Sequence, residues 1–266
     1  MNEQMGVVFS EEHRDFRVMD LFLPEADRAN GACVLFIHGG GWSGGERAAW
    51  HAVAQRLCGL GYVTASTDYR LAPQWKYPAA VEDVRLAMGW LRARAEQYGF
   101  APDRMAALGS SAGGHLAAML ATIRPEDDLG VTPELPLRDT VPNAVVCYCP
   151  VLDVAGWGKT HPDAVEAFLG KPPDEDPQLC AQASPTERVT GQEPYVLFVH
   201  GSADETVPIS QCMEMGKRLG EAGAQADLVV LSDVGHGFGY GVETPAQREA
   251  LRRVEPFLKN VLGTGT

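Results

Sequence analysis

One serine stands between glycines at a point where an apolar run gives way to a helical stretch. The motif GSSAG (109–113) has Ser111 at its centre. In a Gly-x-Ser-x-Gly turn between a strand and a helix, the strained backbone lifts the central hydroxyl clear of the sheet, and the glycines let the two backbones pass closely. The motif therefore predicts Ser111 as a nucleophile. Ser110 occupies the x position, so its side chain is expected to point away.

A run of three glycines upstream supplies the electrostatic help that such a nucleophile needs. HGGGW (38–42) ends the first buried apolar run. Attack on a carbonyl leaves negative charge on its oxygen, and loss of one preorganised N–H donor raises the barrier by roughly 3–4 kcal/mol. We predict that the N–H groups of Gly39, Gly40 and Ala112 form this oxyanion hole, with Gly41 as a substitute for either of the first two. A phosphate-binding loop is the alternative, but no G-K-[ST] follows these glycines.

The general base is predicted from the positions of the seven histidines. Only His236 lies in a glycine-flanked loop, VGHGFG, between the last predicted strand and the last predicted helix. His115 follows Ser111 by four residues on the next helix and is expected to pack into the protein. His200 ends a strand before Gly201 and is expected to hydrogen-bond the turn. His236 is therefore the predicted base.

The acid that orients this base is predicted from the end of a strand. In HGSADETVP (200–208), Asp204 lies just past the apolar run YVLFVH, at the strand end where catalytic groups of open α/β sheets gather. Glu205 is a weaker alternative. Asp233 is too close in sequence to His236 for comfortable geometry.

These three residues together predict acyl transfer. His236 would take the proton of Ser111 during attack and return it to the leaving alcohol, while Asp204 fixes the ring tautomer and stabilises the imidazolium. Water would then release the acyl group. Since an ordinary histidine has a pKa of about 6.5, activity is predicted to fall as the pH drops below neutral.

Apolar runs alternate with helical stretches along the chain, which indicates an α/β protein with a parallel sheet covered on both faces. The first predicted strand, 15–24, has one polar face and is expected to be antiparallel. Residues 151–194 interrupt the alternation and are predicted to be a lid or insertion within a single domain, 1–266. The other predicted strands are 33–39, 62–69, 104–110, 144–150, 195–201 and 227–233, and the predicted helices are 47–60, 79–98, 112–123, 209–222 and 245–261.

Charge and composition argue against several classes of partner. A net charge of -13 repels nucleic-acid phosphates and anionic lipid surfaces, which are bound mainly by Lys and Arg. No apolar stretch reaches about 18 residues, and residues 1–16 lack the basic and apolar regions of a secretory signal. The cysteines form no C-x-x-C, so reduced thiols and a cytoplasmic location are expected. The six are Cys33, Cys58, Cys147, Cys149, Cys180 and Cys212.

Taken together, these motifs resemble those of the hormone-sensitive-lipase-like and acetylxylan-esterase-like (BD-FAE-type) branches of the α/β-hydrolase superfamily. The resemblance implies a mostly parallel eight-stranded sheet with helices on both faces and a small lid insertion. It also implies a metal-independent carboxylic ester hydrolase, so neither a metal nor a cofactor is expected. Four stretches carry it: HGGGW (38–42), DYRLAP (68–73) with YPAAVED (77–83), GSSAGGHLA (109–117) and HGSADETVP (200–208).

The sequence departs from these relatives before HGGGW, and it contains further residues to which a structural or a binding role is assigned. Only 37 residues precede HGGGW, too few for the large N-terminal cap of hormone-sensitive-lipase relatives, so an open site covered chiefly by residues 151–194 is expected. Asp68 and Arg70 are interpreted as structural residues in a partly buried ion pair. Three aromatic residues are candidates for lining the acyl pocket, with a place in the core as the alternative for each: Trp42, Phe168 and Phe238.

The sequence supports one function above two others. An open site suits small acyl groups, so we predict a serine carboxylesterase for short-chain, acetyl-type esters, with acetylated sugars or xylo-oligosaccharides as candidate substrates. A formamide or amide hydrolase, arylformamidase-like, would use the same triad and is the alternative. A binding module without turnover is disfavoured because His236 is present. A small-molecule ester is the expected partner, and the oligomeric state stays open.

Overall fold

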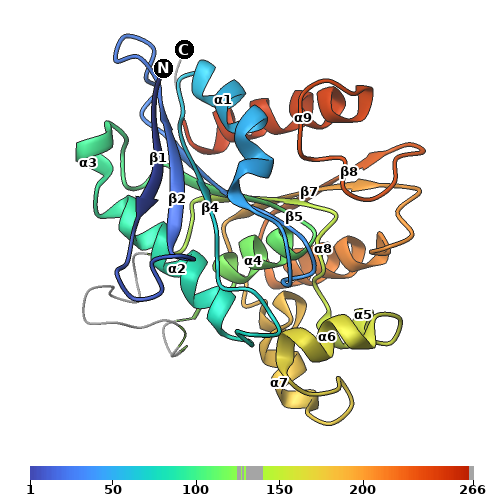
Figure 1. Cartoon of the computed structure of the whole chain (residues 1–266). Coiled ribbons are helices and arrows are strands. Elements are labelled where there is room, and N and C mark those ends of the chain that lie inside the picture. Colours follow the sequence, from blue (N-terminus) through green and yellow to red (C-terminus); the bar gives the residue numbers. More distant parts are fainter. Residues whose placement is uncertain (125–126, 128, 130–139, 264–266) are drawn as a thin grey trace.

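Eight strands form the sheet of this computed structural model, which describes residues 1–124, 127, 129 and 140–263. They are β1 (Asn2–Val8), β2 (Val18–Leu23), β3 (Cys33–Ile37), β4 (Val63–Thr67), β5 (Met105–Ser110), β6 (Ala144–Tyr148), β7 (Tyr195–Gly201) and β8 (Ala226–Leu231). The strands pair in the order β1-β2-β4-β3-β5-β6-β7-β8 (Figure 1). β2 is antiparallel to both of its neighbours, and every pair from β4 to β8 is parallel. The predicted mostly parallel eight-stranded sheet is confirmed.

The first strand, β1, is the one that the sequence did not predict. None of its seven residues is buried, so it has neither an apolar run nor a buried alternating face. It lies at the edge of the sheet and pairs with β2 alone. Pairing with a neighbour, rather than burial, makes this segment a strand. The other seven strands fall within the predicted ranges, to within one residue.

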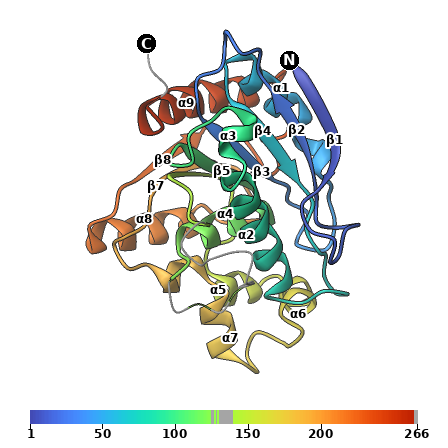
Figure 2. The same ribbon diagram turned by 90° about the vertical axis from the view of Figure 1, so that its left-hand side faces the viewer.

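Helices cover both faces of the sheet, as predicted. They are α1 (His51–Gly59), α2 (Ala79–Arg92), α3 (Ala95–Tyr98), α4 (Ala112–Ala121), α5 (Val154–Gly158), α6 (Pro162–Leu169), α7 (Pro177–Gln182), α8 (Ser210–Ala222) and α9 (Pro245–Val261), with 3-10 turns η1 (Arg47–Trp50) and η3 (Pro185–Arg188). Helices α1 and α9 pack on one face, and α2, α4 and α8 pack on the other (Figure 2). The helix predicted over 79–98 is broken, because the N–H of Arg94 bonds to the carbonyl of Leu91 in a tighter turn.

Residues 151–194, all of them described, contain the helices α5, α6 and α7 and no strand. These helices contact one another and gather beyond one end of the sheet (Figure 1). Phe168 of α6 is buried and stacks on Trp42, so the segment is fixed to the loop that follows β3. Its predicted role as a lid stays a prediction.

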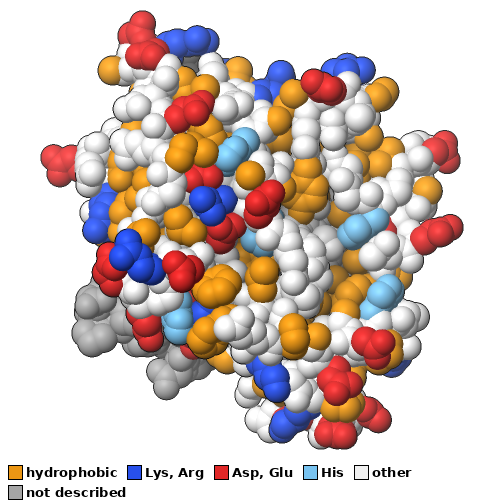
Figure 3. All heavy atoms as spheres, in the orientation of Figure 1, with side chains coloured by type: hydrophobic (Ala, Val, Ile, Leu, Met, Phe, Trp, Pro, Cys, Tyr) orange, Lys and Arg blue, Asp and Glu red, His pale blue; other side chains and the backbone are white. Residues whose placement is uncertain are grey.

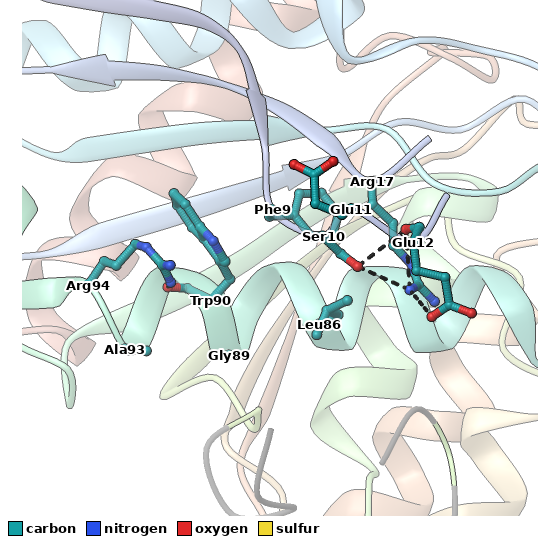
Figure 4. Close-up of a pocket in the computed structure, with 10 residues that line it drawn as sticks. All are labelled: Phe9, Ser10, Glu11, Glu12, Arg17, Leu86, Gly89, Trp90, Ala93 and Arg94. Atoms are coloured by element: carbon teal, nitrogen blue, oxygen red, sulfur yellow. Dashed lines mark hydrogen bonds and ion pairs between the residues drawn. The ribbon is translucent and has the colours of Figure 1, made fainter. Parts of the chain in front are cut away.

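The surface carries charges of both signs. On the face drawn in Figure 3, acidic and basic side chains are interspersed. No described helix is long and apolar enough to cross a membrane. A hollow of about 640 Å³ opens between the β1–β2 loop and α2 (Figure 4), and Glu11 and Trp90 are among the residues that line it. None of the predicted site residues lies in that hollow.

Buried ion pairs hold the chain around the DYRLAP motif. Asp83 of α2 is fully buried and accepts hydrogen bonds from Arg17 Nε at 2.7 Å and Arg70 Nε at 2.9 Å. Asp68 instead pairs with Arg47. The interpretation of Asp68 and Arg70 as structural residues fits these contacts, but each is paired with a different partner.

Loss of the buried carboxylate should be costly. In Asp83→Asn, the two guanidinium groups keep their burial and lose the buried carboxylate that they share, which leaves only the more exposed Glu12 and Glu82 as counter-charges. The free energy of unfolding should therefore fall by about 3–5 kcal/mol. Glu12→Gln is the matched control, because Glu12 also pairs with Arg17 but is 71% exposed, and it should change the stability by less than about 1 kcal/mol. Urea denaturation measures both variants. Equal small losses would show that water screens the Asp83 site.

Candidate active site

Strain and close packing shape the turn that carries Ser111. The residue follows β5 directly and adopts φ 56° and ψ -121°, a backbone conformation that residues other than glycine rarely take. A Cβ on Gly109 would overlap the carbonyl of Gly113, and one on Gly113 would overlap the carbonyl of Ile37 on β3. The two glycines therefore let β5, α4 and β3 meet at this turn. Ser111 is partly exposed, whereas the Ser110 side chain is buried.

The structure brings the three predicted catalytic side chains into contact. His236 Nε2 lies 2.9 Å from Ser111 Oγ, and His236 Nδ1 lies 2.8 Å from Asp204 Oδ2. Each comes from the chain just after a strand of the parallel sheet, namely β5, β7 and β8. With Nδ1–H donated to the carboxylate, Nε2 is the nitrogen left to accept the serine proton.

The surroundings of Asp204 keep it ionised. Its side chain is fully buried, and Oδ1 accepts hydrogen bonds from the N–H groups of Thr206 and Val207, each at 2.9 Å. Burial works against the charge, but hydrogen bonds from His200, His236 and the Val207 N–H outweigh it and hold the pKa of the carboxyl well below its usual range. A fixed negative charge therefore faces the imidazole.

A buried thiol, Cys149, contacts the same imidazole. Cys149 follows β6 with φ 38°, and its side chain is buried beside His236. Burial works against a charged imidazole, but the hydrogen bond to Asp204 and the interaction with the nearby Cys149 thiol outweigh it and raise the pKa of His236 above its ordinary value. For this cysteine the sequence predicted only a reduced thiol, with no part in the site. Its place directly after a strand, like that of Asp204, is the signal that could have identified it.

Of the three predicted oxyanion donors, one already has an acceptor. The N–H of Gly39 donates to the Tyr240 hydroxyl oxygen at 2.6 Å. The N–H groups of Gly40 and Ala112 have no acceptor among the described residues. A Cβ on Gly39 would lie 2.7 Å from Tyr240 Oη and 3.1 Å from Ser111 Cβ, so only glycine fits between these two side chains. Tyr240 was not predicted as a site residue.

The glycine run itself does not form a phosphate loop. Gly39, Gly41 and Gly44 have the G-x-G-x-x-G spacing of dinucleotide-binding loops. In those loops a helix begins within the glycines, but here the N–H of Gly44 bonds to the carbonyl of Gly40 at 3.0 Å in a tight turn. The next helical residue is Arg47.

The aromatic candidates for the acyl pocket are packed in the core. Trp42 and Phe168 are each 1% exposed and stack with ring centroids 4.2 Å apart. Phe238 is 8% exposed and stacks on Tyr148 on the other face of the sheet. Their contact with a substrate stays a prediction. Trp42 follows the glycine run directly in the sequence, and its ring packs against Phe168 of α6.

The remaining candidates are not links in the chain from Ser111 through His236 to Asp204, although His200 also contacts the Asp204 carboxylate, at 3.4 Å. His115 is buried, accepts a hydrogen bond from Trp42 Nε1 at 3.1 Å, and has its pKa lowered to about 4 by burial. His200 bonds to the carbonyl of Val207 at 2.8 Å, as expected of a residue that holds the turn. Glu205 and Asp233, the alternative acids, are exposed.

One group of potential metal ligands lies together in the described part of the chain. Its ligand atoms, from Cys149, Asp204 and His236, all lie within 4.8 Å of one another. Asp204 and His236 already share a hydrogen bond of 2.8 Å. The arrangement is that of an acid and a base joined by a proton.

Comparisons with known proteins point to esterases. The family model BD-FAE matches residues 19–219. The chain is 33% identical to Esterase LipC of Mycobacterium tuberculosis over 77% of this chain and 52% of LipC. It is 31% identical to the probable carboxylic ester hydrolase LipM of the same organism, over 91% of this chain and 57% of LipM. The chain thus spans about half the length of these curated relatives.

Solved structures with the same fold cover nearly the whole chain. A carbohydrate esterase from gut microbiota, in truncated form, has a TM-score of 0.85 at 23% identity and covers 99% of this chain and 97% of its own. Esterase 2 of Thermogutta terrifontis, phosphoramylated by tabun, has a TM-score of 0.82 at 26% identity and covers 96% of this chain and 94% of its own. The predicted α/β-hydrolase fold is confirmed.

The contacts around His236 predict how its protonation responds to substitution. In Cys149→Ala and Asp204→Asn, the ring loses a hydrogen bond that favours its charged form, so its pKa should fall below that of the unmodified protein. The imidazole would then lose its proton at a lower pH. NMR titration of the ring measures the change.

Cys58→Ala is the matched control for this titration. Cys58 is also a buried, reduced cysteine, but it lies in α1 and makes no contact with the site. Its loss should leave the His236 titration unchanged. An unchanged pKa in Cys149→Ala as well would mean that the thiol does not interact with the ring.

Proposed function

The chain belongs to the BD-FAE family, as its motifs predicted, and we propose that it is a carboxylic ester hydrolase that forms an acyl-enzyme on Ser111. One observation carries this proposal: the hydrogen-bonded chain from Ser111 Oγ through His236 to Asp204, with distances of 2.9 and 2.8 Å. The names of LipC and LipM, an esterase and a probable carboxylic ester hydrolase, agree with it.

In the first half of the reaction, Ser111 is acylated. Oγ attacks the ester carbonyl carbon while His236 Nε2 takes the hydroxyl proton, and the carbonyl electrons move onto its oxygen. The buried carboxylate of Asp204 stabilises the imidazolium that forms. When the tetrahedral intermediate collapses, the bond to the alcohol oxygen breaks and His236 donates the proton to that oxygen.

In the second half, water replaces the alcohol. His236 takes a proton from water as the water oxygen attacks the acyl carbon, and returns it to Ser111 Oγ as the acid leaves. Both halves therefore need the neutral imidazole at the start. Because the pKa of His236 is raised, kcat/KM should increase with pH past the ordinary histidine range, rather than reach its plateau at neutral pH.

The oxyanion donors in this proposal are the N–H groups of Gly40 and Ala112, neither of which has an acceptor among the described residues. Ala112 is also the first residue of α4, where the helix dipole favours negative charge. The N–H of Gly39, predicted as a donor, is engaged by Tyr240.

Short acyl groups are the substrates that the packing supports best. Trp42 directly follows the glycine run and its ring is buried against Phe168, so we expect this packing to limit the room for a long acyl chain. Two proteins of this fold are named a carbohydrate esterase and an acetyl ester-xyloside bifunctional hydrolase. Acetyl esters, and acetylated sugars among them, are therefore the first substrates to test.

Removal of the nucleophile tests the proposal directly. In Ser111→Ala, kcat for p-nitrophenyl acetate should fall by about 10⁴-fold or more, because the acyl-enzyme can no longer form. The Thermogutta terrifontis esterase is phosphoramylated by tabun, so a fluorophosphonate should label the unmodified chain. Peptide mass spectrometry should find that label on Ser111.

Ser210→Ala, which removes an exposed serine at the start of α8, is the control and should keep both turnover and labelling. Retained turnover in Ser111→Ala would remove the mechanism. Faster hydrolysis of N-formylkynurenine than of p-nitrophenyl acetate would replace ester hydrolysis by formamide hydrolysis.

Acyl-chain preference tests the role of the aromatic pair. Phe168→Leu should open space beside Trp42 and raise the ratio of kcat/KM for p-nitrophenyl octanoate to that for the acetate by about tenfold. Phe257→Leu removes the same volume from α9 on the other face of the sheet and should leave the ratio unchanged. Equal ratios in all three proteins would show that Phe168 does not limit acyl length.

A further inference from the structure

The hydroxyl of Tyr240 lies beside Gly39 and close to Ser111, and it has no role in the reaction as proposed so far. Its oxygen accepts the Gly39 N–H at 2.6 Å. A Cβ on Gly39 would touch both this oxygen and Ser111 Cβ, at 2.7 and 3.1 Å, so the hydroxyl and the nucleophile flank the same side of Gly39. Tyr240 belongs to the loop that also carries His236, only four residues further on.

The hydrogen-bonding capacity of this hydroxyl is half used. A phenol oxygen accepts through its lone pairs and donates one proton. The Gly39 N–H donates to the oxygen, and this bond and the nearby Ser110 side chain both favour the ionised form of the phenol. Burial outweighs them and raises the pKa of Tyr240, so the phenol keeps its proton at neutral pH. Among the described residues the Gly39 N–H is the partner at hydrogen-bond distance, and because it is a donor it leaves the phenol proton free for another acceptor.

The ring is held in place from behind. It packs on Trp50, with ring centroids 4.7 Å apart, and Trp50 Nε1 donates to the carbonyl of Ile37 at 3.0 Å. Ile37 is the last residue of β3, directly before the glycine run. The hydroxyl is therefore fixed relative to that run before any substrate binds, as an effective oxyanion donor must be.

We propose that Tyr240 is a further oxyanion-binding residue, whose O–H donates to the carbonyl oxygen of an ester held at Ser111. It acts together with the Gly40 and Ala112 N–H groups and takes the place that the sequence assigned to the Gly39 N–H. No proton is transferred. The hydrogen bond strengthens as negative charge develops on the oxygen, which is why it accelerates attack. The inference rests on the proposed ester hydrolysis.

Removal of the Tyr240 hydroxyl tests the proposed oxyanion role. Tyr240→Phe should lower kcat for p-nitrophenyl acetate by about 10²-fold or more, with KM unchanged. The affinity for a trifluoromethyl ketone, which forms a tetrahedral oxyanion on serine, should fall by a similar factor. Tyr148→Phe is the matched control, because its buried hydroxyl has no partner among the described residues and its ring also packs near Trp50. That variant should keep the activity of the unmodified protein.

A second measurement does not depend on how well Tyr240→Phe folds. A fluorinated tyrosine at position 240 keeps the shape of the ring and lowers the pKa of the phenol. Since a phenolate cannot donate, kcat should then decline at high pH, at a lower pH than in the unmodified enzyme. The same residue placed at position 148 should leave the pH profile as it was. A merely structural tyrosine would show no such alkaline limb.

The outcomes separate the inference from the proposed function. If the unmodified chain hydrolyses no ester and Ser111 takes no fluorophosphonate label, the proposed function fails. If the unmodified chain is active, three results would overturn the oxyanion role of Tyr240. Tyr240→Phe could be equally active, it could differ from the unmodified chain in KM alone, or it could keep its affinity for the trifluoromethyl ketone. The same holds if the fluorinated protein has an unchanged alkaline profile.

Discussion

The imidazole of His236 must touch two groups that are 125 and 32 residues away in the chain, and the rest of the structure depends on this contact. Hydrogen bonds of 2.9 and 2.8 Å tolerate little displacement at either end. The parallel sheet meets this demand, because β5, β7 and β8 all point the same way and deliver their following residues to one edge. The base can then bridge from the end of β8 to the end of β5 across the two strands between them.

The strained turn at Ser111 needs support from its surroundings. A φ of 56° at a residue with a side chain costs about 1–3 kcal/mol, so the neighbouring packing must hold it. Every residue of β5 and α4 is buried, and the glycines on either side of Ser111 let the carbonyls of β3 and α4 approach closely. The hydrophobic core and the position of the Ser111 hydroxyl are therefore parts of one arrangement. A looser core would let Ser111 relax away from His236.

The sequence predicted the residues whose positions follow from strand ends, and missed those whose roles depend on tertiary contacts. Ser111, Asp204 and His236 each follow an apolar run, so topology alone brings them together. Tyr240 has no motif of its own, and only the folded loop shows that its hydroxyl meets Gly39. Cys149 stands in an apolar run, where composition favours a core residue. β1 was missed for a different reason, because its residues are not buried and edge pairing leaves no periodicity to detect.

The contact between Gly39 and Tyr240 joins two loops that act together in the proposed reaction. There the His236 loop would supply the base, and the glycine run after β3 would supply the Gly40 N–H as an oxyanion donor. Each loop follows a different strand, and β3 and β8 lie four places apart in the sheet. Without a bond between them, motion of either loop would separate proton transfer from charge stabilisation. The 2.6 Å hydrogen bond between the Gly39 N–H and Tyr240 holds the two loops together. Trp50 packs on the tyrosine ring and donates to the carbonyl of Ile37, so the tyrosine is also held near the end of β3. Tyr240, four residues after His236, thus links both halves of the proposed site.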